Sequence, residues 1–217
     1  MSSRFNPQFT YYRRDKLAEV FFSIFLVGLF FPKRMFSGLP EAKNLKDSTI
    51  LLGMYLSIPS ILMTTTFGAI ASTMAPNMVI GALIFISILP LSLAIGLSTS
   101  LLWSRWLSWS LSRISGKPVP MVSVFQVCAY SGPPFVIAWG PYLGPVMALW
   151  NLVLNWKGLR FHCKVGGWKV FFAMTLGILL LALIIIAIAF ILFLLLPENV
   201  NMLLESVELL MQQRGWL

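Results

Sequence analysis

Long apolar runs alternate with short polar links along the chain. Four runs, residues 48–75, 78–103, 121–139 and 168–196 after its Lys169, reach or approach the roughly 20 apolar residues that a helix needs to cross a bilayer core. A fifth run, residues 142–156, has fifteen residues and would be about 22 Å long as a helix. The pattern predicts an all-α, polytopic membrane protein with five transmembrane helices, of which the fourth is short.

Two further segments are predicted to lie at the membrane surface. The run VFFSIFLVGLFF, residues 20–31, has twelve residues, a length typical of an interfacial or re-entrant segment. The Phe-rich segment 17–36 around it carries basic groups at both ends, so it either covers the cytoplasmic end of the bundle or senses anionic lipid. Near the C-terminus, Leu203, Val207 and Leu210 recur at helical spacing and predict an amphipathic helix on the outer surface.

Three regions follow from this pattern. Residues 1–47 form a basic cytoplasmic arm with the interfacial helix, residues 48–196 form the five-helix membrane domain, and residues 197–217 form the outer tail. The arm lacks a short apolar core ending in a small-residue cleavage site, so we do not expect a cleaved signal peptide.

Composition and charge agree with a membrane protein and orient it. The chain is 58% hydrophobic and 11% charged, whereas soluble domains carry about a quarter charged residues. With five spans, 15 of the 16 basic residues fall on one side of the membrane. The positive-inside rule therefore places the N-terminus in the cytoplasm and the C-terminus outside, which suits a bacterial inner membrane. Because the basic residues lie between apolar runs, nucleic acid is not an expected partner.

Groups that catalyse reactions or bind metals are scarce. None of the five apolar cores contains Asp, Glu, Lys, Arg or His, the residues that mark ion paths and catalysis inside membranes. The only histidine, His162, stands beside Cys163 without a second histidine or a nearby carboxylate, so it builds neither a metal site nor a triad. Cys128 and Cys163 are expected to be free thiols. We expect no enzyme activity, no metal and no cofactor.

A helix break is predicted within the third span. In VCAYSGPPFVIAWGPYLGP, residues 127–145, the GPP at 132–134 interrupts the helix about midway. The carbonyls near Cys128 to Tyr130 lose their helical partners, and in lipid they must be met by protein or water. The candidate partners are Gln126, Asn151 and Asn155, and the break should face the fourth helix. They serve either interhelical hydrogen bonding or a ligand site. The candidate site comprises Gln126, Tyr130, Ser131, Gly132, Pro133, Pro134, Asn151 and Asn155.

Basic and aromatic residues at the cytoplasmic side predict contacts with lipid head groups. The helix of the second span is expected to continue through WSRWLSWSLSRI, residues 103–114. Tryptophan prefers the head-group level, so this segment is either an ordinary aromatic belt or a binding site for a specific lipid. The candidate head-group contacts are Arg13, Arg14, Lys33, Arg34, Trp103, Arg105, Trp106 and Trp109.

The order of these features resembles the Yip family of membrane proteins. The likeness covers residues 30–196 and consists of FFPKRMF in the arm, five spans, AYSGPP in the third and the Trp-rich ALWNLVLNW in the fourth. In that family an aromatic-small dipeptide followed by proline recurs in the central span, matched here by Ala129, Tyr130, Ser131 and Pro134. Eukaryotic members are implied in early secretory trafficking and bind Rab-type GTPases through their arms. The acidic and glycine-rich arm motifs of those members are missing here, so GTPase binding is not expected. The short basic arm, the tail and the positive-inside bias suit a prokaryotic-type member.

Three functions are compatible with the sequence. The first is a non-enzymatic membrane-organising or scaffold protein, whose partners are membrane lipids and other membrane or cytoplasmic proteins, with a homo-oligomer as an open alternative. The second is a lipid-handling or small-solute transport protein that uses the broken third and fourth helices. The third is an intramembrane enzyme, for which Cys163 is the only candidate nucleophile.

Overall fold

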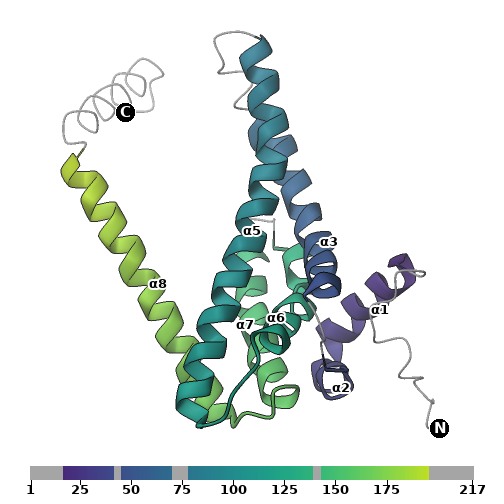
Figure 1. The fold of residues 1–217 in the computed structure, drawn as a ribbon. Coiled ribbons are helices and arrows are strands. Elements are labelled where there is room, and N and C mark those ends of the chain that lie inside the picture. Colours follow the sequence, from purple (N-terminus) through teal and green to yellow (C-terminus); the bar gives the residue numbers. More distant parts are fainter. Residues whose placement is uncertain (1–16, 42–44, 70–77, 139–142, 196–217) are drawn as a thin grey trace. The chain divides into compact units, whose positions relative to one another are not determined.

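The structure, a computed structural model, describes residues 17–41, 45–69, 78–138 and 143–195 (Figure 1). Within these ranges the chain forms helices and no strand, which confirms the all-α class. Arg13, Arg14 and the predicted amphipathic tail lie outside the described residues. The elements are α1 (Leu17–Phe30), α2 (Pro32–Ser37), α3 (Lys46–Met63), η3 (Thr64–Gly68), α5 (Met78–Ser115), α6 (Met121–Tyr130), η4 (Pro133–Val136), α7 (Leu143–Phe161) and α8 (Gly167–Leu195).

Three of the described helical segments are long and apolar enough to cross a membrane. They are Lys46–Thr66, Ile86–Ser115 and Gly167–Leu192, and they support a membrane-embedded protein. The third predicted span is not one continuous helix, because α6 ends after 10 residues and would be only about 15 Å long. The fourth predicted span, α7, has 19 residues but ends in a polar turn with Arg160. Crossing by these two segments therefore stays a prediction.

The predicted interfacial segment is two helices rather than one. α1 ends at Phe30, and α2 begins at Pro32, which occupies the first turn of α2. Proline there lacks only an amide hydrogen that the first turn leaves unpaired, whereas within a continuing helix it would clash with the preceding turn. One side of α1 packs inward through Ile24 and Val27, and α2 buries Phe36.

The chain forms two compact units, residues 1–174 and residues 175–217. In the second unit, the large apolar side chains between Leu176 and Leu192 are all exposed. A helix that is apolar on every face is typical of a membrane span. The first unit contains the helices from α1 to α7 and the beginning of α8, and it carries the residues of both candidate sites.

The helix of the second span continues as predicted, since α5 runs without interruption to Ser115. Gly116 then adopts a left-handed backbone conformation, with φ of +69°, and reverses the chain. Two serines of α5 hold the returning loop: Ser108 Oγ donates to the Val119 carbonyl at 2.6 Å, and the Val119 amide donates to Ser112 Oγ at 2.9 Å. This loop brings α6 back against α5.

The hairpin of α6 and α7 packs closely against α2. Gly158 on α7 lies directly beside Val127 on α6, and a Cβ atom added to it would lie 2.8 Å from Phe36 Cε1 on α2. Only a residue without a side chain allows the three helices to approach this closely. Because Ser131 lies beside Asn151 while Val127 lies beside Gly158, α6 and α7 run antiparallel.

Candidate functional site

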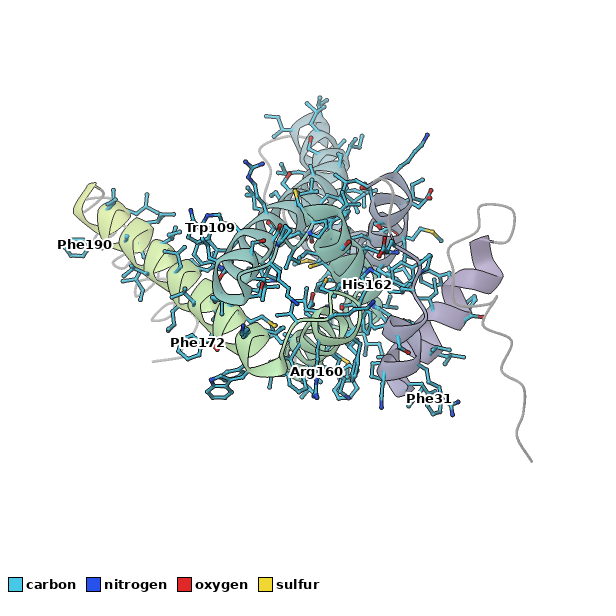
Figure 2. The ribbon with its side chains drawn as sticks, turned by 60° about the horizontal axis from the view of Figure 1, so that its bottom comes forward. Phe31, Trp109, Arg160, His162, Phe172 and Phe190 are labelled. Carbon is cyan, nitrogen blue, oxygen red and sulfur yellow. The ribbon has the colours of Figure 1, made fainter. Side chains whose placement is uncertain are left out.

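A surface of cations and aromatic rings covers the end of the first unit where α2 meets the end of α7. We call it the basic aromatic face, and Figure 2 turns it toward the viewer, with Phe31 and Arg160 labelled. It comprises Phe31, Lys33, Arg34, Lys157, Arg160 and Phe161.

Each cation of this face lies near an aromatic ring, and for Lys157 this ring is that of Trp150, with Nζ 5.7 Å from its centroid. Lys33 Nζ lies 5.7 Å from the centroid of the Phe161 ring, and Arg160 Cζ lies 5.5 Å from the same centroid. Arg34 Cζ lies 5.7 Å from the Phe31 centroid. Such placements are worth about 0.5–1 kcal/mol each at exposed sites. The Phe161 ring thus lies beside charges from two helices, α2 and α7.

The predicted head-group contacts differ in how exposed they are. Lys33 and Arg34 are exposed on the basic aromatic face, and Arg105 is exposed on α5. Trp109 is exposed and lies 5.3 Å from Trp106, measured between ring centroids. Trp103 and Trp106 are partly buried and pack against the core, so much of their surface contacts protein.

Sequence reasoning missed the part of this face that α7 supplies. Lys157 and Arg160 entered only as charges that orient the chain, and Phe161 did not enter at all. The signal was present as alternating aromatic and basic residues in WKGLRF, residues 156–161. What the sequence did not show is that α2 packs beside this segment.

The predicted helix break is present. α6 ends at Tyr130, where the Ser131 amide still donates to the Val127 carbonyl at 2.9 Å. Pro133 and Pro134 then begin the short 3-10 helix η4. Proline supplies no amide hydrogen for a bond one turn back, so the α-helix stops and a tighter turn replaces it.

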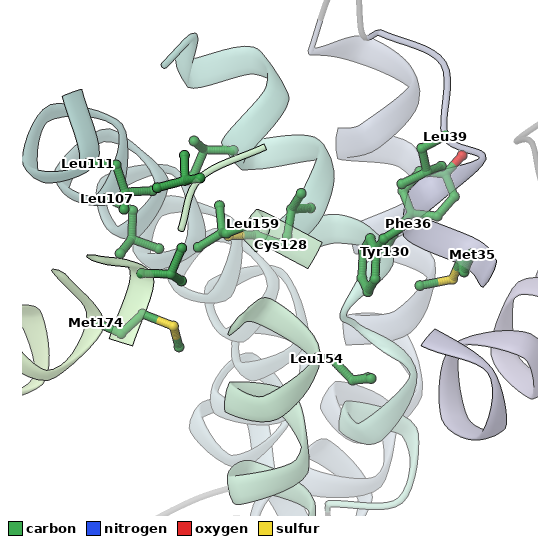
Figure 3. Close-up of a cluster of buried hydrophobic side chains, with 14 of the residues drawn as sticks. Met35, Phe36, Leu39, Leu107, Leu111, Cys128, Tyr130, Leu154, Leu159 and Met174 are labelled. Atoms are coloured by element: carbon green, nitrogen blue, oxygen red, sulfur yellow. The ribbon is translucent and has the colours of Figure 1, made fainter. Parts of the chain in front are cut away.

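The break lies inside the bundle, as predicted. Gly132, Pro133 and Pro134 are buried. A Cβ atom added at Gly132 would lie 2.6 Å from Tyr55 Cδ2 on α3, and one added at Gly28 on α1 would lie 3.1 Å from Pro133 Cγ. Helices α1, α3 and α7 therefore all contact the break. Tyr130, one turn earlier, is buried in the core that Figure 3 shows.

Asn151 supplies the hydrogen bond that the break requires. Its Nδ2 donates to the Ser131 carbonyl at 2.6 Å, and Asn155 Nδ2 in turn donates to Asn151 Oδ1 at 3.0 Å. Asn155 thus holds the side chain of Asn151, and Asn151 contacts the break directly. The carbonyl that Asn151 satisfies belongs to Ser131, one residue later than the predicted range of residues 128–130. The helix extends this far because the Ser131 amide still donates to the Val127 carbonyl.

Gln126 does not serve the break. Its Nε2 donates to the Pro40 carbonyl at 3.2 Å, in the connection between α2 and α3. The prediction that it meets the freed carbonyls is therefore wrong. Helical spacing places Gln126 on the same face as Tyr130, but one full turn farther from the break.

Several buried polar atoms find no hydrogen-bond partner among the described residues. They are Tyr55 Oη, Trp106 Nε1, Gln126 Oε1 and Asn155 Oδ1. Tyr55 was not among the predicted site residues, although its ring adjoins Gly132. The buried polar side chains of the described part are all neutral, so this region can donate and accept hydrogen bonds but holds no ionised group.

His162 and Cys163 lie in the connection between α7 and α8, and Cys163 packs against the core. Burial lowers the pKa of His162, with Glu41 opposing that effect. Burial, reinforced by Cys128, raises the pKa of the Cys163 thiol to about 12. A thiol with such a pKa is almost entirely protonated at neutral pH and is a poor nucleophile. The described residues contain no cluster of three metal-ligating side chains.

Comparisons of the chain with protein-family models, with curated proteins and with solved structures find no match. The resemblance to the Yip family therefore stays a prediction, based on the motifs quoted above.

Proposed function

We propose that the chain is a non-enzymatic integral membrane protein of the Yip type, which organises the membrane or serves as a scaffold for a partner protein. The observation that carries this proposal is the closed helix break. Its residues are buried, and Asn151 bonds the Ser131 carbonyl. Polar groups there bind one helix to another, and the exposed chemistry lies at the basic aromatic face.

The positive-inside distribution supports a position in a bacterial inner membrane, with the N-terminus in the cytoplasm and the C-terminus outside. The Yip-type plan counts α6 with η4, and α7, as two crossings. A re-entrant hairpin is the alternative to these two crossings, because the apolar part of α7 before Lys157 has about 14 residues and would reach only about 21 Å into a core of about 30 Å. Either arrangement returns the chain to the cytoplasmic side and leaves the orientation unchanged.

Labelling from each side of the membrane tests this topology. In a variant without Cys128 and Cys163, a single cysteine replaces Leu143, the first residue of α7, which is 50% exposed. A re-entrant hairpin predicts slow labelling by membrane-impermeant maleimide from both sides. Rapid labelling from the outside would instead support two full crossings. A cysteine at Lys117 serves as the cytoplasmic control.

Photo-crosslinking in native membranes tests the scaffold function. A photoreactive phenylalanine analogue replaces Phe31, which is 54% exposed on the basic aromatic face, or Ile86, which is 68% exposed in the predicted second span. The proposal expects a defined protein adduct from position 31 and mainly lipid adducts from position 86. Lipid adducts alone at both positions would count against a partner at this face.

A lipid-handling or small-solute transport protein is the second candidate. The unpartnered polar atoms of Tyr55 and Asn155 near the break favour it, because a passing polar group could satisfy them. Vesicles containing the purified protein would show lipid scrambling or solute flux that changes in a Pro134→Ala variant. Absence of both activities would remove this candidate. Loss of a measured activity in a Cys163→Ser variant would be needed to support an enzyme.

A further inference from the structure

We propose that the basic aromatic face binds the phosphate of an anionic phospholipid, with Lys33 and Arg160 as the two charged contacts. The proposal does not depend on a partner protein, so it goes beyond the scaffold function. It requires only that the protein lies in a membrane.

The arrangement of charges points to a bound anion. Lys33 and Arg160 come from different helices, and both lie beside the Phe161 ring, at 5.7 Å and 5.5 Å from its centroid. Because both charges lie beside one ring, they are at most about 11 Å apart. A negative group that contacts both is attracted by each of them. Among the described residues, neither cation forms an ion pair with a carboxylate. The carboxylate of Glu41 acts on His162, two residues after Arg160.

Arg160 and Lys33 contact the phosphate in different ways. The planar guanidinium of Arg160 can donate two parallel hydrogen bonds to phosphate oxygens, whereas the ammonium of Lys33 acts as a point charge. Arg160 Cζ is also 5.8 Å from the Trp156 centroid, and Trp156 Nε1 is anchored by a 2.8 Å bond to the Gly167 carbonyl. The anchored ring limits the positions that the guanidinium adopts.

An exposed apolar stripe beside these cations favours a lipid over a soluble phosphate. Phe22, Leu26 and Phe30 follow each other four residues apart on α1, and their exposed fractions are 64%, 53% and 69%. Phe31 continues the stripe up to Lys33. Bulky apolar side chains next to basic groups match the boundary between acyl chains and anionic head groups. A free phosphate ion would use the cations and leave this stripe unused.

Competitive lipid binding tests the site in the full-length protein. The chain is extracted into mixed micelles containing equal amounts of phosphatidylglycerol and phosphatidylcholine, and native mass spectrometry measures the ratio of the two bound lipids. The test variant is Lys33→Gln with Arg160→Gln. The control variant is Arg113→Gln with Lys117→Gln, which removes the same charge from exposed positions near the end of α5.

The site predicts that the test variant lowers the phosphatidylglycerol preference about twenty-five-fold, at about fivefold per charge, while the control changes it less than twofold. Equal losses in both variants would show a general charge effect and overturn the site, as would an unchanged ratio in both. Arg160→Lys keeps the charge and should lose only part of the preference, which provides a milder variant if the double change prevents folding. Displacement of the lipid by millimolar inorganic phosphate would overturn the lipid assignment.

Discussion

The helix break and the basic aromatic face handle polarity in opposite ways. At the break, neutral groups are buried and Asn151 bonds the Ser131 carbonyl at 2.6 Å. At the face, cations such as Lys33 and Arg160 stay accessible and have aromatic rings rather than carboxylates beside them. Burying a neutral amide costs little once it is hydrogen-bonded, whereas burying an unpaired charge is costly. The buried amide of Asn151 therefore links two helices, whereas the exposed cations of the face stay accessible to the surroundings of the protein.

The largest effect is expected at Cys163, which adjoins the exposed Lys164 but belongs to the closed part of the unit. Alkylation requires the thiolate. Since the pKa of Cys163 is raised from 9.0 to about 12, iodoacetamide at pH 8 should modify it about fiftyfold more slowly than in the chain unfolded in SDS, because the smaller thiolate fraction outweighs the higher nucleophilicity of that thiolate. Timed alkylation followed by peptide mass spectrometry measures both rates. Equal rates would show that Cys163 is accessible to solvent, like the cations of the basic aromatic face.

A pair of glycine substitutions tests how tightly the closed region is packed. Gly158→Ala should lower the free energy of unfolding by about 1–3 kcal/mol, because the added methyl group meets Val127 and Phe36. Gly53→Ala is the matched control, because an added Cβ atom there has no neighbour within 4 Å. In a helix it should stabilise by about 0.5–1 kcal/mol. Thermal unfolding in detergent compares them, and a stable Gly158→Ala variant would contradict this packing.

Removing the amide at the break is expected to have a smaller effect. Asn151→Leu leaves the buried Ser131 carbonyl without its 2.6 Å bond and should destabilise the protein by about 1 kcal/mol. Ser87→Ala removes an exposed hydroxyl that donates to the Leu83 carbonyl at 2.8 Å, and it should change stability little. If the two variants unfold alike in the same assay, hydrogen bonding at the break contributes nothing beyond ordinary packing.

The smallest effect is the pH dependence from His162. Because burial lowers the pKa of His162, the unfolded chain binds a proton at a higher pH than the folded chain does. The contribution of this residue to stability is therefore present above the ordinary pKa of 6.5 and decreases as pH falls below it. Unfolding midpoints between pH 7 and pH 5 should fall more in the wild-type protein than in His162→Gln. Parallel curves would show that His162 is as open to water as the basic aromatic face.

Part of the candidate site at the helix break can be predicted from the sequence. Its location followed from Pro133 and Pro134, since proline stops an α-helix whatever surrounds it. The hydrogen bond from Asn151 could also be predicted, because a freed carbonyl in an apolar setting requires a donor. The partner of Gln126 could not be predicted, because helical spacing shows which face a side chain shares but not which loop packs over it. Pro40 lies 86 residues away in the chain, and only tertiary packing brings its carbonyl to Gln126.

The sequence by itself determined the all-α membrane class, the position of the helix break, the continuation of α5 through residues 103–114 and the concentration of positive charge in the segments between alternate apolar runs. These follow from run length, proline and charge, which act locally along the chain. The tertiary structure decided that Gly158 lets α7 approach Val127 and Phe36, that Asn151 reaches Ser131, and that Lys33 and Arg160 share one aromatic ring. Each of these depends on which helices pack together, because close contact between distant segments is set by the fit of whole surfaces.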